Sequence, residues 1–231
     1  MSSTPRIVVY GPRSTPYTEK VVRALRLKAL EHEVVEPSSA EDYRRWSPET
    51  GLLPAMECEG RWVSDSAAIL DHLDARFPEP PLASTDPRTA REQRRLEAWV
   101  GDTFSFYLLR WLRRRLGAEA DSGEQEGAAA RRGPLSRLGL IGPDGRLRPE
   151  AFDTRDGGPG PEFEQRIADL EKLLGVRPFF FADRISRADL AVFGALHGLH
   201  TGQYPGGREL LGRHPRLLAH AHRVGEATGG A

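Results

Sequence analysis

The segment from residue 6 to residue 36 reads RIVVYGPRSTPYTEKVVRALRLKALEHEVVE and contains three elements in order. The short apolar, β-branched run at 6–10 predicts a buried strand, and residues 32–36 predict a second one. Between the two strands, Thr15 suits the N-cap of a helix and Pro16 suits its first position. Strand, helix and strand within this length predict a βαβ unit with parallel strands and a right-handed crossover.

A second pair of strands is expected after a polar, turn-rich stretch at 37–51. Residues 53–58 and 61–63 flank a Glu-Gly turn, which predicts a β-hairpin. Pro54 opens this hairpin, so that end of the strand cannot donate a ladder hydrogen bond. A helix over 66–76 follows, and a proline-rich segment ends it.

Helical periodicity dominates the second half of the chain. Residues 88–116 place apolar side chains at a steady three-four spacing, which predicts one long helix. Further helices are expected at 162–174, at 190–199 and from Pro215 onward. The segment from about 117 to 160 is rich in Gly, Ala, Arg, Pro and Glu, and we expect an irregular insertion there.

These elements predict two domains, residues 1–82 and residues 88–225, joined by a short linker. The first would be α/β and the second all-helical. The length of 231 residues is sufficient for two small domains.

Composition narrows the class of protein. The 33 basic side chains balance the 33 acidic ones, which argues against a nucleic-acid partner and gives no reason to expect an acidic membrane surface. The one cysteine, Cys58, excludes an internal disulfide and a multi-cysteine metal site. The start of the chain has no signal-peptide pattern, and no run approaches the length of a membrane span. We therefore expect a soluble, cytoplasmic protein.

Four short motifs occur in an order that resembles the glutathione transferase superfamily. TPYTEKV at 15–21 resembles the family's first-helix motif, and SPETGLLP at 47–54 resembles the loop before its cis-proline. SDSAAIL at 64–70 resembles the segment that holds the γ-glutamyl group of glutathione, and Ser186 with Asp189 resembles a buried capping box. The resemblance implies an α/β thioredoxin-like domain (βαβ-ββα) followed by an all-α helical bundle domain. It also implies a homodimer that uses glutathione as co-substrate, without a metal.

The resemblance assigns the activation of sulfur to hydroxyl groups near the first helix. A free thiol has a pKa of about 8.5, and attack on an electrophile needs the thiolate. A hydroxyl donor and the positive end of a helix dipole both favour the charged form. Thr15 is the first candidate for this role, Ser14 the second, and Tyr10 at the end of the first strand the third. The alternatives are that Thr15 is a plain helix cap and that Tyr10 is a core residue.

Binding of the peptide is assigned to two other segments. By resemblance, the Leu53–Pro54 bond is cis and the Leu53 backbone pairs with the cysteinyl backbone of glutathione. Asp65 would take the γ-glutamyl ammonium, while Ser66 and the free N–H groups of its helix would take the carboxylate. The alternative for Pro54 is an ordinary strand-starting proline, and for Asp65 it is capping alone.

One feature departs from the family pattern. Many relatives have a lysine or similar donor just before the cis-proline loop, where it binds the glycyl carboxylate, but residues 50–52 here carry no charge. Arg44, Arg45 and Arg61 are the candidates to replace it.

The second substrate would be an apolar electrophile between the two domains. Tyr107, Phe104 and Trp111 are candidates to line its pocket, and they suit core packing equally well. Cys58 lies in the hairpin and not at a helix start, which argues against a redox role and against the cysteine-using branch of the family.

Histidines provide no clear metal site. The pairs at 197/200 and 220/222 lack the carboxylate or cysteine partners that a closed zinc site needs, so we predict no metal. Three functions stay open from the sequence. The first is conjugation of an electrophile by a glutathione transferase, and the second is non-catalytic binding or scaffolding. The third is another glutathione-dependent reaction, namely isomerisation, dehalogenation or peroxide reduction.

Overall fold

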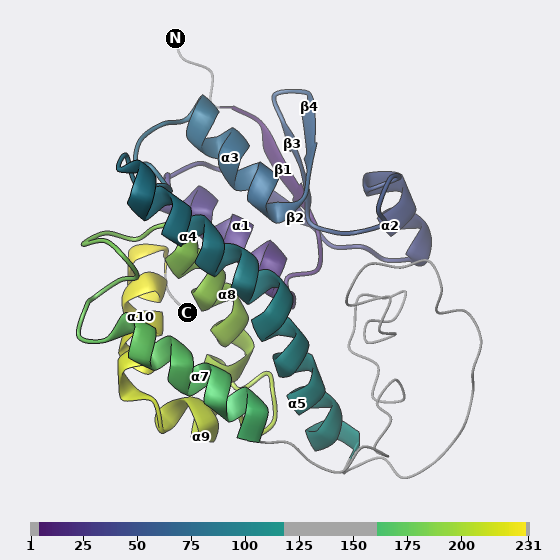
Figure 1. Cartoon of the computed structure of the whole chain (residues 1–231). Coiled ribbons are helices and arrows are strands. Elements are labelled where there is room, and N and C mark those ends of the chain that lie inside the picture. The colour runs from purple at the N-terminus through teal and green to yellow at the C-terminus, as the bar shows by residue number, and fades with distance from the viewer. Residues whose placement is uncertain (1–4, 118–160, 230–231) are drawn as a thin grey trace.

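The computed structural model describes residues 5–117 and 161–229, and residues 118–160 of the expected insertion lie outside this range (Figure 1). A four-stranded sheet has the order β2-β1-β3-β4. β1 (Ile7–Tyr10) pairs in parallel with β2 (Glu33–Val35) and antiparallel with β3 (Ala55–Cys58). β4 (Arg61–Ser64) pairs antiparallel with β3 and forms one edge of the sheet. The predicted βαβ unit and hairpin are confirmed.

Two helices cover one face of this sheet. They are α1 (Pro16–Leu27) and α3 (Ser66–Arg76). Alternate strand residues point toward them, because successive side chains in a strand lie on opposite faces. The buried core on this face includes Ile7, Val9, Val21, Leu25, Met56 and Ile69.

A third helix, α2 (Ala40–Trp46), lies apart from α1 and α3 within the stretch that the sequence indicated as irregular (Figure 1). Ser39 is its N-cap and accepts a hydrogen bond from the Asp42 N–H, while the Asp42 carboxylate accepts one from the Ser39 N–H. This capping box stabilises a short helix built from polar residues, which have no apolar periodicity to announce it.

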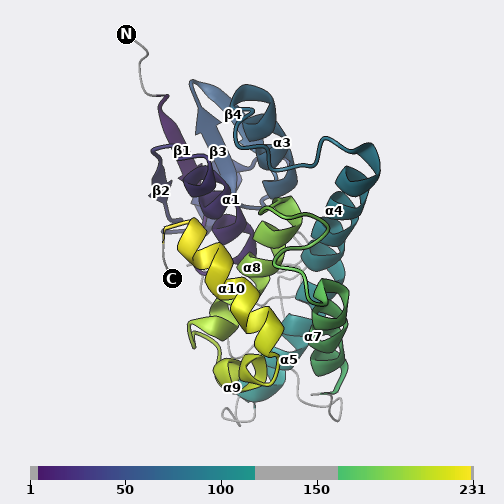
Figure 2. The ribbon, with the colours of Figure 1, turned by 90° about the vertical axis from the view of Figure 1, so that its left-hand side faces the viewer.

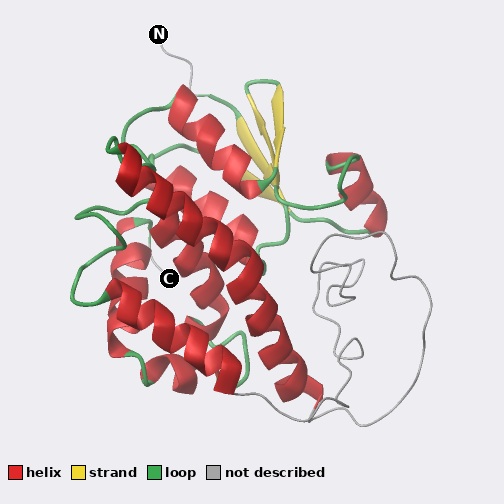
Figure 3. Ribbon diagram, in the orientation of Figure 1, coloured by secondary structure: helices red, strands yellow, loops and turns green. Residues whose placement is uncertain are grey.

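The helical half contains seven described segments. They are α4 (Pro87–Trp99), the π-helical η1 (Val100–Phe104), α5 (Ser105–Gly117), α7 (Pro161–Leu174), α8 (Arg187–His200), α9 (Gly207–Gly212) and α10 (Pro215–Ala227). Figure 3 shows the strands together near one end of the molecule and only helices and loops in the described part away from them, which is the predicted fold class. None of the described helices has both the length and the apolar character needed to cross a membrane.

The long helix predicted at 88–116 is interrupted by the π-helical turn. The Ser105 hydroxyl donates to the Val100 carbonyl at 2.9 Å, and the Tyr17 hydroxyl donates to the Gly101 carbonyl at 2.6 Å. Side chains therefore take carbonyl groups that the α-helical ladder would otherwise use, which is a known cause of helix irregularity. The Tyr17 contact comes from α1, so sequence periodicity along this helix could not reveal it.

Helix α8 is central and is buried along almost its whole length, with α10 beside it (Figure 2). Its capping box is confirmed: the Asp189 carboxylate accepts from the Ser186 N–H and hydroxyl at 2.8 and 2.7 Å. At Gly194 the α8 backbone reaches the start of α1, since a Cβ there would lie 2.4 Å from the Pro16 carbonyl oxygen. The two halves of the chain are thus in direct backbone contact beside the first-helix motif.

Candidate functional site

The first turn of α1 is capped as predicted. Thr15 is only 7% exposed, and its Oγ1 accepts a hydrogen bond from the Thr18 N–H at 3.3 Å. The single hydroxyl proton of Thr15 has two acceptors within the protein, the Pro12 carbonyl at 3.1 Å and Thr18 Oγ1 at 3.0 Å. Ser14 beside it is exposed, and its hydroxyl makes no hydrogen bond to any described residue.

The loop after β1 brings this turn against the predicted cis-proline. The Leu53–Pro54 bond is cis, as expected. A Cβ on Gly11 would lie 2.5 Å from Thr18 Oγ1 and 3.3 Å from Pro54 Cα, so the three segments touch where only glycine fits. The Leu53 N–H has no hydrogen-bond partner within the described chain, which leaves it available to a ligand.

The start of α3 differs from the expectation. Asp65 is the N-cap, and its Oδ1 accepts from the N–H groups of Ala67 at 2.8 Å and Ala68 at 3.0 Å. Two amides expected to be free for an anion are therefore already bound, and the Ser66 N–H is the one left without a described partner. Asp65 is exposed, and its Oδ2 takes no hydrogen bond from the described residues.

Tyr17 in the first turn of α1 contacts the helical half through its bond to Gly101, although the sequence did not single it out for a role. Its pKa is raised, chiefly by burial and further by the nearby carboxylates of Asp102 and Asp65, while a hydrogen bond with Ser105 acts in the opposite direction. Helices α1 and α3 share one core on the sheet, and the Asp65 charge is the smallest of these causes.

Tyr10 lies on the opposite face of the sheet. Because Val9 belongs to the core beneath α1, the next side chain along β1 points the other way. The Tyr10 ring packs between Trp46 and Trp62, each with its centroid 4.9 Å away, and its hydroxyl donates to Glu57 at 3.4 Å. Burial and the Glu57 charge raise the Tyr10 pKa. The structure does not bring Tyr10 to Thr15.

The three aromatic candidates for the electrophile pocket separate into two groups. Phe104 and Trp111 are fully buried and pack on Phe163, with their ring centroids 5.2 and 5.4 Å from the Phe163 centroid, respectively. These two rings are part of the core. Tyr107 is half-buried beneath the guanidinium of Arg166, whose Cζ lies 5.2 Å from the ring centroid.

The loop before Pro54, in the uncharged stretch at 50–52, is held by Thr50. The Ser47 and Thr50 hydroxyls are 2.8 Å apart, and the Leu52 N–H donates to Thr50 Oγ1 at 3.2 Å. Arg44 and Arg45 are exposed in the last turn of α2, directly before this loop, and neither forms an ion pair with a described residue. Arg61 is exposed on the edge strand β4.

Cys58 is buried in the core beneath α1 and α3, and burial raises the pKa of its thiol, which disfavours the reactive thiolate. Among the described residues, no group of three or more His, Cys, Asp or Glu side chains is placed to hold a metal ion. The sequence pairs 197/200 and 220/222 are not the contacts that the histidines make. His200 packs edge-to-face on His222, while His220 contacts the Asp189 carboxylate at 2.9 Å.

Comparisons with known proteins agree with this geometry. The family model described as the N-terminal domain of glutathione S-transferase matches residues 9–81, and the model of its C-terminal domain matches residues 163–224. Glutathione S-transferase omega-1 of Mus musculus is 30% identical over 99 residues, which are 41% of this chain and 41% of the mouse protein. Maleylacetoacetate isomerase of Pseudomonas aeruginosa is 29% identical over 105 residues, which are 42% of this chain and 48% of the isomerase.

These matches span less than half the length of each curated relative. A solved structure extends the likeness in fold to the whole chain. A glutathione S-transferase from Methylobacterium radiotolerans, in complex with glutathione sulfonate, superposes with a TM-score of 0.64 at 24% identity. That superposition covers 98% of this chain and 96% of the other. Two family models in the right order and a shared fold over both halves lead to one conclusion: the chain belongs to the glutathione transferase superfamily.

Proposed function

We propose that the protein binds reduced glutathione and activates its thiol as the thiolate for attack on a small apolar electrophile. The observation that carries this proposal is the meeting of the α1 turn, the loop after β1 and the cis-proline around Gly11. Membership of the family makes glutathione the ligand that this combination suits.

The proposed seating of glutathione uses the groups that have no other partner. The Oδ2 atom of Asp65 would bind the γ-glutamyl ammonium, and the hydroxyl and N–H of Ser66 would bind the adjacent carboxylate. The Leu53 backbone beside Pro54 would pair with the cysteinyl backbone as an added strand. Arg44 or Arg45 is the proposed partner of the glycyl carboxylate.

Stabilisation of the sulfur is assigned to Thr15, with Ser14 as the alternative donor. Thr15 lies at the positive end of the α1 dipole, where a thiolate is favoured. Its hydroxyl proton must turn from Pro12 or Thr18 toward the sulfur, whereas Ser14 has no such competing acceptor. Tyr10 stays the third candidate and has the least favourable geometry, because its side chain lies across the sheet from α1.

Residues 1–82 are proposed as the glutathione-binding domain, and residues 88–225 as the helical domain that supplies the pocket for the electrophile. Tyr107 is the proposed pocket residue, while Phe104 and Trp111 support it from the core. A homodimeric state belongs to the proposal on the family resemblance alone, and a cytoplasmic location belongs to it on the sequence pattern.

Two other functions each have an observation in their favour. The relative named maleylacetoacetate isomerase favours a different glutathione-dependent reaction, in which the thiolate adds to the substrate and leaves again. The internally bound Thr15 proton and the uncharged Thr50 position favour non-catalytic binding or scaffolding. Dehalogenation and peroxide reduction need the same thiolate.

The first test is calorimetric titration of the protein with reduced glutathione near neutral pH. We expect saturable binding at one site per chain, and an absence of binding up to millimolar ligand would overturn the proposal. Turnover with chlorodinitrobenzene then separates catalysis from scaffolding. Thr15→Ala should lose turnover and keep binding, while Thr15→Ser, which retains the hydroxyl and the cap, should keep both. A panel of haloalkanes, peroxides and cis-enones separates the alternative reactions.

A further inference from the structure

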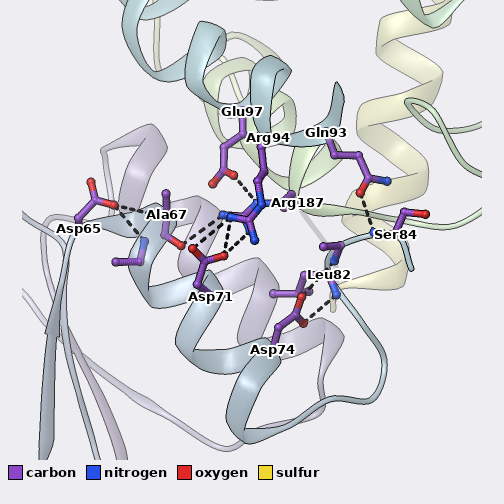
Figure 4. A network of polar contacts seen from close by, with 12 residues as sticks. Asp65, Ala67, Asp71, Asp74, Leu82, Ser84, Gln93, Arg94, Glu97 and Arg187 are labelled. Carbon is purple, nitrogen blue, oxygen red and sulfur yellow. Dashed lines mark hydrogen bonds and ion pairs between the residues drawn. The ribbon is translucent and has the colours of Figure 1, made fainter. Parts of the chain in front are cut away.

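A buried arginine from the helical half reaches the start of α3 (Figure 4). Arg187 is the first residue of α8 and is only 1% exposed. Its Nε donates to Glu97 on α4, and its Nη1 donates to Asp71 on α3. Its Nη2 donates to the carbonyl of Ala67 at 3.3 Å. One guanidinium thus contacts three acceptors on two helices.

The two carboxylates in this network have further partners. Glu97 also accepts from Lys20 Nζ on α1 at 2.8 Å, and both of these side chains are at least nine-tenths buried. Asp71 also accepts from Arg94 on α4 at 2.8 Å, but both of these side chains are about half exposed. Buried charges are tolerated only when their partners stay in place, so the network fixes α1, α3, α4 and α8 relative to one another.

The network ends at the first turn of α3. The Ala67 N–H is bound to Asp65 Oδ1 at 2.8 Å, and the carbonyl of the same residue is bound to Arg187. Asp65 itself has a φ of 77°, which a residue with a side chain rarely adopts. Such a conformation persists only when the surroundings hold it. Arg187 is a group from outside this turn that binds one of its first helical residues, Ala67.

We propose that Arg187 is a positioning residue for the glutathione site, because it holds the Ala67 carbonyl and thereby the Asp65–Ser66 turn in the shape that receives the γ-glutamyl group. This inference rests on the proposed function. It assigns control of an α3 binding turn to a side chain of the helical half. Arginine suits this position because its planar fork holds separate N–H donors in a fixed geometry toward three acceptors, whereas a lysine ammonium carries its donors on one nitrogen at the end of a flexible stem.

The test compares Arg187→Lys with Arg94→Met as a matched control. Both variants alter the ion pairing of Asp71, but only Arg187 of the two donates a hydrogen bond to the Ala67 carbonyl. For Arg187→Lys we expect KM and Kd for reduced glutathione to rise on the order of tenfold, with kcat at saturating glutathione little changed. Arg94→Met should leave both constants within about twofold, as expected for an exposed pair.

A second measurement does not depend on glutathione. Amide hydrogen exchange at Ala67 and Ala68, followed by NMR in the ligand-free protein, should become faster in Arg187→Lys and stay unchanged in Arg94→Met. If wild-type protein fails to bind glutathione, the proposed function fails, and the exchange rates alone decide whether Arg187 holds the turn. If Arg187→Lys does not fold, the double variant Arg187→Gln with Glu97→Gln is used in its place, because it conserves the net buried charge. Unchanged exchange at both amides together with an unchanged KM would overturn the positioning role.

Discussion

The starts of α1 and α3 are both capped helix ends at the proposed site, but their caps are used differently. At α1 the buried hydroxyl of Thr15 has one proton and two acceptors inside the protein. At α3 the exposed carboxylate of Asp65 binds two amides through Oδ1 and leaves Oδ2 open. The α3 start can therefore receive a ligand group without losing its cap, whereas Thr15 must exchange one hydrogen bond for another.

The supports of the two helix starts also differ in kind. Close backbone packing of Gly194 on Pro16 and the hydrogen bond from Tyr17 to Gly101 hold the α1 start. The polar network around Arg187 holds the α3 start. Packing fails when volume is added, and a polar network fails when a donor is removed, so different substitutions should disturb each end.

The largest effect is expected from Gly194→Ala. The new Cβ would lie 2.4 Å from the Pro16 carbonyl oxygen, so α8 and the α1 start must separate. Overpacking of this kind costs about 2–3 kcal/mol of unfolding free energy. Urea denaturation measures it, with Gly212→Ala as the control, because a Cβ there meets nothing within 4 Å. Equal stability of the two variants would show that packing does not hold the α1 start.

Substitution of Asp65 separates capping from ligand binding. Asp65→Asn keeps an oxygen for the Ala67 and Ala68 amides but removes the charge proposed to bind the ammonium. We expect its Kd for reduced glutathione to rise roughly tenfold, with a loss of stability below about 0.5 kcal/mol. Asp65→Ala should weaken binding similarly and also cost about 1 kcal/mol, because the cap is lost. If Asp65→Asn binds glutathione as wild type does, the carboxylate serves as a cap alone.

A smaller effect is expected from Tyr17→Phe. Loss of the hydroxyl removes the hydrogen bond from α1 to the Gly101 carbonyl of the π-helical turn, at a cost of about 1 kcal/mol. Tyr10→Phe is the control, because the Tyr10 hydroxyl is half-buried and its bond to Glu57 is long, at 3.4 Å. Chemical denaturation should place Tyr17→Phe clearly below Tyr10→Phe in stability. The reverse order would mean that the hydroxyl does not link α1 to the helical half.

The smallest effect concerns pH. Burial lowers the pKa of His197, which packs on α1 with its Nδ1 3.8 Å from Glu19, so the folded protein binds a proton less readily there than the unfolded chain. The contribution of neutral His197 to stability is present above the unfolded pKa of about 6.5 and is lost as pH falls below it.

Asp71, on α3, titrates under more acidic conditions. Its pKa is lowered: burial alone would raise it, but hydrogen bonds from Arg187 and Arg94 outweigh burial. Its contribution is therefore lost only under more acidic conditions, below about pH 4.

Urea unfolding at about pH 7.5 and 5.5 checks the different pH ranges in which His197 and Asp71 are expected to affect stability. His197→Gln should reduce the loss of stability on acidification across this range, whereas Asp71→Asn should lower stability about equally at both pH values. An undiminished acid loss in His197→Gln would assign the pH dependence to another group.

Local chemistry was sufficient to predict the βαβ unit, the hairpin, the Thr15 cap and the capping box at Ser186. Each of these depends on residues close together in the chain, whose spacing and hydrogen-bonding capacity can be read directly. The cis state of Leu53–Pro54 followed from the family resemblance, which is a longer pattern of the same kind.

Other features arise from contacts between distant segments. Helix α2 has too few apolar residues for a periodic signal, and the π-helical turn depends on a hydroxyl from α1. The face of the sheet that holds Tyr10 and the reach of Arg187 to Ala67 depend on how elements pack. A sequence states which donors and acceptors a chain carries, but packing selects which of them meet, because a hydrogen bond forms only within about 3 Å and across any separation in the chain.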